Sequence, residues 1–94
     1  MNGRQQQGHF TEYAVVVDTN ILLAHPRVEA IEWGVTPITV FILESVLHQE
    51  LAGLRRNHNP SVAQRAREAF EHLTALEQQM EDGGYAVPGG QLRI

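Results

Sequence analysis

Hydrophobic positions change their spacing along the chain in a way that predicts strands alternating with helices. Residues 13–17 and 36–42 are rich in β-branched residues and predict two strands. The continuous apolar run at 13–17 is typical of a strand that is buried on both faces of a parallel sheet. Thr19 and Asn20 are helix-capping residues ahead of an apolar run, which predicts a short helix that ends at the His25-Pro26 pair. A second short helical piece is predicted at 28–33.

Turn and capping residues divide the second half of the chain. A helix is predicted over 44–56, and Asn59 followed by Pro60 predicts the start of a long helix that ends before Gly83. After a Pro-Gly-Gly turn, residues 91–94 predict the opening of another strand. Helices that alternate with strands indicate an α/β layer architecture. Residues 1–12 lack periodicity and predict a disordered leader, which leaves residues 13–94 as the folded domain.

Composition excludes several classes of protein. The 94 residues are 43% hydrophobic and contain no cysteine, which excludes a disulfide scaffold and a thiolate metal site. No apolar run approaches the ~20 residues of a membrane span, and no signal peptide is visible, so we expect a cytoplasmic protein that does not enter a membrane.

Charge is unevenly distributed. The formal net charge is −4, yet the segment 55–67 holds four of the seven basic residues and no acid: Arg55, Arg56, Arg65 and Arg67. All basic residues are arginines, a bias that suits phosphate recognition and that a GC-rich coding sequence also produces. The cluster therefore predicts either a phosphate-binding surface or an ordinary solvated one.

Asp18 is the first candidate for chemistry. In open parallel sheets, ligands bind beyond the carboxyl ends of the strands, and Asp18 directly follows the first predicted strand. Thr19 and Asn20 are placed to orient its carboxylate. The alternative is that Asp18 is only a helix N-cap, whose side chain accepts the free amides of the next turn.

Glu50 is the second candidate. On a regular α-helix it lies about 30° from the centre of the apolar stripe, since successive residues are about 100° apart. A Glu that points inward is disfavoured in a purely structural helix, although pairing with an Arg or reaching solvent would also explain it. Glu44 falls near the edge of the stripe. Two carboxylates without Cys or paired His specify an oxygen-ligand cation such as Mg²⁺ or Mn²⁺ rather than zinc. No phosphate-binding Gly loop occurs, so no ATP site is expected in this chain.

Four segments resemble a known family. "VVVDTNILLAHP" resembles the first strand and turn of PIN domains, which are metal-dependent ribonucleases, and "ESVLHQELAGLRR" resembles their helix with a Glu-Leu pair. "VAQRAREAFEHLTAL" and "VPGGQLRI" are similar to segments of the PIN domain found in front of PhoH-like ATPases. The resemblance runs from about Tyr13 to Ile94 and implies a three-layer fold with a parallel sheet flanked by helices.

The resemblance also implies a site and a reaction. Asp18 and Glu50 take the places of metal-binding and catalytic residues, with Asn20 the polar neighbour of Asp18 and Glu44 a weaker candidate for the glutamate. The implied activity is endonucleolytic hydrolysis of RNA phosphodiesters by metal-activated water, and the four arginines of segment 55–67 would contact the RNA backbone.

Two features depart from the family pattern. Ala52 stands where the subgroup often has Asp, and the family's remaining metal-binding aspartates follow the strand that residues 91–94 begin. The sequence therefore predicts a domain truncated at its C-terminus. The alternative to a nuclease is an incomplete PIN-like module that binds RNA or a protein partner without cleavage, and a second copy of the chain is a further expected partner.

Overall fold

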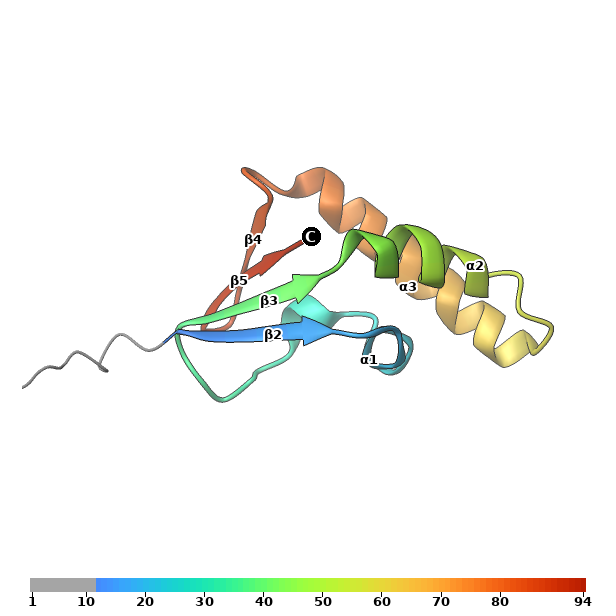
Figure 1. Ribbon diagram of the computed structural model, residues 1–94, viewed down its shortest axis with the longest axis horizontal. Coiled ribbons are helices and arrows are strands. Elements are labelled where there is room, and N and C mark those ends of the chain that lie inside the picture. Colours follow the sequence, from blue (N-terminus) through green and yellow to red (C-terminus); the bar gives the residue numbers. More distant parts are fainter. Residues whose placement is uncertain (1–11) are drawn as a thin grey trace, which may run out of the picture.

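The computed structural model describes residues 12–94, and it contains one sheet with helices at one side and one end (Figure 1). Within these residues the strands lie in the order β2-β3-β5-β4. Their bounds are Tyr13–Val17 for β2, Ile38–Ile42 for β3, Gly90–Arg93 for β5 and Gly84–Val87 for β4. The predicted α/β class is confirmed. The predicted leader, Glu12 excepted, lies outside the described residues.

The sheet is mixed. β3 pairs in parallel with β2 and with β5, whereas β4 pairs antiparallel with β5 across a tight turn. Gly89 adopts a φ of 81° in this turn, a conformation that favours glycine. At Gly90 the backbone approaches Ile38 so closely that a Cβ atom would collide with the Ile38 backbone. The two glycines thus allow the hairpin to close and dock against β3.

The expectation that the first strand is buried on both faces is wrong. β2 stands at the edge of the sheet in the described residues, and of its five residues only Val17 is buried. Val16 is 62% exposed, and its register partner Phe41 on β3 is 36% exposed. The β-branched run predicted the strand and its parallel partner correctly, but composition does not distinguish a covered face from an open one.

Packing is concentrated on one face of the sheet. Alternating strand residues from this face join helical residues in a single core, which contains Val17, Ile38, Val40, Ile42, Leu92, Leu22, Leu47, Leu51 and Leu73. The opposite face carries Val16 and Phe41. The predicted three-layer fold has helices on both faces of the sheet. Within residues 12–94, helices cover only the first face.

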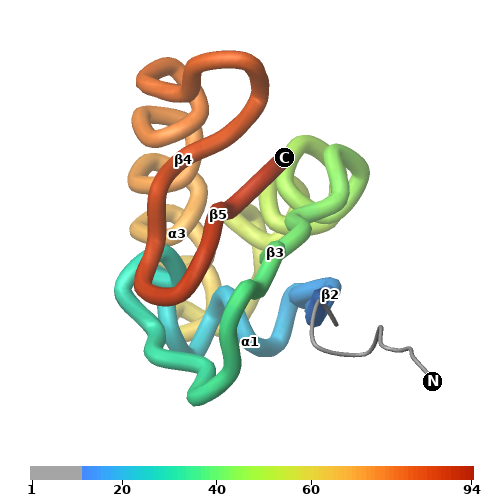
Figure 2. Tube along the Cα trace, turned by 90° about the vertical axis from the view of Figure 1, so that its left-hand side faces the viewer, coloured from blue at the N-terminus to red at the C-terminus, as the bar shows by residue number. Residues whose placement is uncertain are grey.

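The helices follow the predicted order with shifted bounds. α1 spans Thr19–Ala24 and ends at His25 as predicted, but its N-cap is Asp18, so Thr19 and Asn20 lie inside the helix. The second piece is only the short 3₁₀ turn η2, Val28–Ala30. The predicted helix at 44–56 is helical from residue 44 to residue 54. Its middle is the π-helical segment η3, Val46–Leu51, which continues into α2, Ala52–Leu54. This segment, green in Figure 2, leaves the end of β3, and both η3 and α2 contact α3.

The long helix begins where its capping signal predicts. α3 spans Pro60–Gln79, and the side chain of its N-cap Asn59 accepts hydrogen bonds from the backbone amides of Ser61 and Val62. Small residues bring α3 close to its neighbours, since Ala63, Ala66 and Ala69 are all buried. α3 therefore holds the other helices near the ends of the strands.

Parallel pairing brings three strand ends to one edge. The carboxyl ends of β2, β3 and β5 point toward the helices, and the last residue lies near the end of β3 (Figure 1). This edge is where an open parallel sheet presents its ligand-binding loops.

None of the described helices is long and apolar enough to cross a membrane.

Candidate functional site

Asp18 lies at the carboxyl edge of the sheet, immediately after β2. Its Oδ1 accepts a 3.0 Å hydrogen bond from the backbone amide of Ile21, so the side chain is the N-cap of α1. The capping interpretation of Asp18 is therefore correct as a description of the fold. It does not exclude a second role, because Asp18 is exposed and its Oδ2 accepts no hydrogen bond from another described residue.

Glu50 reaches the same place from a different element. Its Oε1 accepts a 2.7 Å hydrogen bond from the hydroxyl of Thr19, the residue that directly follows Asp18. Glu50 is the fifth residue of η3, the segment that continues from β3, so the neighbouring strands β2 and β3 deliver one carboxylate each. The bond brings together two sites that are 31 positions apart in the sequence.

The expectation that Glu50 points into the core is wrong. Glu50 and Glu44 are both exposed, whereas Val46, Leu47 and Leu51 are buried. The physical reason is the π-helical turn, whose hydrogen bonds span five residues instead of four. This wider turn changes the angle between successive side chains, so the arc calculated for a regular α-helix does not apply. Glu50 is turned to the surface and toward Thr19.

The two remaining predicted neighbours differ in their surroundings. Thr19 is half-buried and its hydroxyl is committed to Glu50, whereas Asn20 is exposed and its side chain makes no hydrogen bond with another described residue. The sequence predicted that Thr19 would orient Asp18. The structure instead gives it Glu50 as a partner, a contact that no local sequence signal could reveal because it depends on how β2 and β3 pair.

The carboxylates of Asp18 and Glu50 are suitable ligands for a hard cation, but they are only two. Asp18 and Glu50 each offer a carboxylate oxygen that accepts no hydrogen bond within residues 12–94, and such oxygens are the ligands that Mg²⁺ and Mn²⁺ prefer. Groups of three or more His, Cys, Asp or Glu side chains that could hold a metal do not occur in the described part of the chain. The pair would therefore anchor a cation that keeps water in its other positions.

The arginines of segment 55–67 fall into two kinds. Arg55 is half-buried: its guanidinium lies 4.1 Å from the centre of the Phe70 ring and its Nε donates to the Ala52 carbonyl. Arg67 donates to the Arg55 carbonyl and to Gln64. Arg56 and Arg65 are exposed and make no hydrogen bond with another described residue. Two of the four guanidinium groups thus have partners within residues 12–94, and the two others, Arg56 and Arg65, have none.

A family model described as a PIN domain matches residues 15–93. The chain belongs to the PIN domain family. Apart from the first two residues of β2, this match covers every strand and helix that builds the site, up to the end of β5. Searches of curated proteins and of solved structures gave no significant match.

Membership of this family indicates the general type of activity. PIN domains are generally of the nuclease type, and in this PIN domain Glu50 is bonded to Thr19, the residue that directly follows Asp18 at the carboxyl end of β2. The π-helical turn that presents Glu50 is a feature often found at functional sites. Sequence reasoning missed the turn because nothing in the residues 46–51 distinguishes it from an ordinary α-helix.

Proposed function

We propose that this PIN domain is an endoribonuclease that hydrolyses RNA phosphodiester bonds with Mg²⁺ or Mn²⁺ held by Asp18 and Glu50. The observation that carries the proposal is the 2.7 Å hydrogen bond from Thr19 to Glu50, which brings the glutamate beside the residue that follows Asp18. In a family generally of the nuclease type, a carboxylate directly after β2 and a second one bonded to the next residue, at the ligand-binding edge of the sheet, support a metal-dependent cleavage site.

Each side chain has a distinct task in this proposal. A bound cation would activate a water molecule and stabilise the charge that develops on the phosphate. Asp18 is fixed by its bond to the Ile21 amide, and Glu50 by its bond to the Thr19 hydroxyl. Because both carboxylates are held before ligand binds, little conformational entropy is lost when they engage it. Asn20 stands beside them as a polar group toward solvent.

Arg55, Arg56, Arg65 and Arg67 are proposed to bind the RNA backbone. Arg56 and Arg65 contribute charge that is not engaged by another described residue, while Arg55 and Arg67 support the shape of this surface through Phe70 and Gln64. Contacts of this kind give affinity that does not depend on the RNA sequence and that falls as salt is raised.

The subgroup proposed from the sequence is the PIN domain found in front of PhoH-like ATPases. What supports it is the sequence resemblance of the "VPGGQLRI" segment, which holds the last residue of β4, the glycine turn and β5. This part of the proposal concerns ancestry, and the proposed chemistry does not depend on it.

A cleavage assay with matched variants tests the proposal. Asp18→Asn removes one charge but retains an N-cap, because Asn caps helices as well as Asp does. Asp82→Asn is the matched control: Asp82 lies on an exposed turn with a φ of 55°, a conformation that Asn tolerates well. With Mn²⁺ and a single-stranded RNA, we expect Asp18→Asn to lose cleavage and Asp82→Asn to keep it.

Metal titration provides the second arm of the test. Glu50→Gln keeps an acceptor for Thr19 but removes the charge, so Mn²⁺ should bind more weakly in calorimetry, while Glu44→Gln on the same helical segment should bind as wild type does. RNA binding without cleavage by the wild type would support the alternative, a PIN module that binds without cutting. Equal cleavage by wild type and Asp18→Asn would remove Asp18 from the mechanism.

A further inference from the structure

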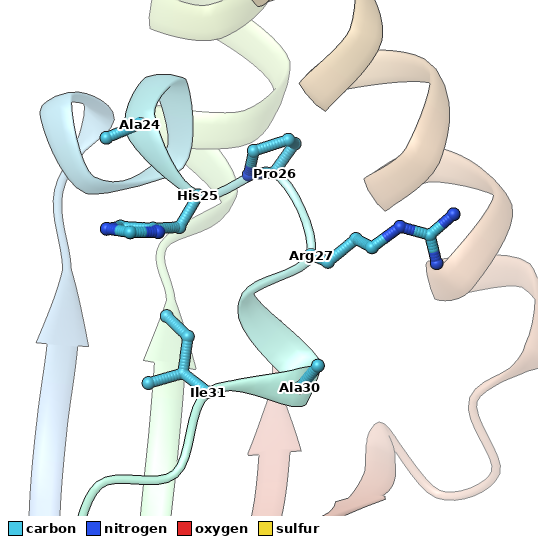
Figure 3. A pocket seen from close by; sticks show the side chains of 6 residues that line it. All are labelled: Ala24, His25, Pro26, Arg27, Ala30 and Ile31. Atoms are coloured by element: carbon cyan, nitrogen blue, oxygen red, sulfur yellow. The ribbon is translucent and has the colours of Figure 1, made fainter.

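A pocket lies at the C-terminal end of α1, the helix that Asp18 caps at its other end. It has a volume of about 320 Å³ and is lined by Ala24, His25, Pro26, Arg27, Ala30 and Ile31. These residues come from the end of α1 and from η2, which follows it. Figure 3 shows the six side chains.

The lining combines an apolar floor with two basic side chains. In Figure 3 the His25 ring lies above the side chain of Ile31, and Arg27 extends from the other side toward α3. Both His25 and Arg27 are exposed. None of the residues that line the pocket is acidic, and the nearby Glu29 is turned to α3, where it is bonded to His72 at 2.8 Å. The pocket is therefore a local exception in a chain with a net charge of −4.

This combination suits a nucleotide. An aromatic imidazole above an aliphatic side chain offers a surface on which a planar base can stack, and an exposed guanidinium is suited to a phosphate. A base pocket without acidic groups does not repel the phosphates on either side of the base. Stacking on such a surface tolerates many sequences, because every base has a π-face.

The position of the pocket links it to the carboxylate pair. α1 has six residues, so its two ends are roughly 9 Å apart at 1.5 Å per residue, with Asp18 capping one end and His25 capping the other. A single-stranded RNA held at Asp18 and Glu50 would reach the pocket within the number of nucleotides that one single-strand-binding domain usually contacts.

We propose that this pocket is a substrate subsite that receives one base and one phosphate of a single-stranded RNA whose scissile bond lies at Asp18 and Glu50. His25 and Ile31 hold the base and Arg27 holds the phosphate. The inference rests on the proposed nuclease function and adds to it the place where the strand is gripped beyond the cleavage point.

The test measures binding in metal-free buffer, separately from cleavage. Wild type, His25→Ala and Arg27→Gln are titrated with a labelled single-stranded RNA, with Gln78→Ala as the control for an exposed side chain outside both the pocket and segment 55–67. We expect His25→Ala to raise Kd about tenfold, in line with the loss of one stacked base. Arg27→Gln should raise Kd and lower the slope of log Kd against log salt by about 0.7, the value for one phosphate contact on a single strand. Gln78→Ala should bind as wild type does.

Nuclear magnetic resonance locates the contact. On addition of RNA, the amide signals of residues 24–31 should shift, and uridine monophosphate alone should shift them only at far higher concentration. Equal shifts at equal concentration would assign the pocket to free nucleotides and overturn the strand subsite. An unchanged Kd in both pocket variants would also overturn the strand subsite. In that case, a loss of metal-dependent cleavage in Asp18→Asn would still support the proposed nuclease function. A wild type that neither binds nor cuts RNA would overturn both.

Discussion

The Thr19 hydroxyl and the Glu50 carboxylate are joined by a 2.7 Å hydrogen bond. This bond connects the first turn of α1 to the π-helical segment η3, and so it ties the end of β2 to the chain that leaves β3. It orients Glu50 although that side chain is exposed. The direction of this carboxylate is thus set by a polar contact rather than by burial.

Replacing Thr19 tests whether this contact prepares the site. Thr19→Val keeps the size of the side chain but removes the donor, and Thr19→Ser keeps the donor. We expect Thr19→Val to weaken Mn²⁺ binding roughly tenfold, the lower end of the range for groups that orient a metal ligand, and Thr19→Ser to stay close to wild type. Calorimetric titration measures both. Equal affinity in the two variants would show that Glu50 does not need Thr19.

Gly90 gives a sharp prediction about stability. A Cβ atom at this position would collide with the Ile38 backbone, so Gly90→Ala must push β5 away from β3. Gly53 in α2 has no atom within 4 Å of a Cβ placed there, and Gly53→Ala should stabilise the fold by roughly 0.5–1 kcal/mol because Ala favours helix. Urea unfolding should show opposite signs for the two variants. A neutral Gly90→Ala would mean that the β3–β5 pairing adjusts easily.

Asn59 tests the start of α3. Its side chain accepts hydrogen bonds from the amides of Ser61 and Val62, and loss of an N-cap costs about 1 kcal/mol. Asn59→Ala should therefore lower the free energy of unfolding by about that amount, while Asn59→Asp retains a capping oxygen and should be nearly neutral. Thermal or urea unfolding measures the difference. Similar losses in both variants would point to packing of the Asn59 side chain instead of its capping bonds.

Local signals predicted most of the elements. The β-branched run ahead of Asp18 became β2, and the Asn59-Pro60 pair marks the start of α3 to the residue. These signals succeed because capping and backbone preferences are decided within a few residues. Asp18 was located for the same reason, since a carboxylate directly after a strand occupies a fixed place in a parallel sheet.

Features that depend on tertiary contacts were not predictable in the same way. The direction of Glu50 followed from an assumed α-helical repeat, which the π-helical turn breaks. The burial of β2 was overestimated because a run such as Tyr13–Val17 has the same composition at an edge as in a covered strand. Arg55 lies over the Phe70 ring of α3, and Arg67 of α3 donates to the Arg55 carbonyl, contacts that only the packing of α3 reveals.

The division among the arginines predicts two different responses to substitution. Arg56→Gln and Arg65→Gln remove exposed charges, so each should lower the salt slope of RNA binding by about 0.7 and leave the free energy of unfolding unchanged. Arg55→Gln removes the guanidinium from the Phe70 ring and should destabilise the fold by about 0.5–1 kcal/mol. Arg93→Gln, which lies in β5 outside this cluster, is the control for binding. Since stability and salt slope are measured independently, a change in slope for Arg93→Gln equal to that for Arg56→Gln would show that net charge, and not this surface, governs RNA affinity.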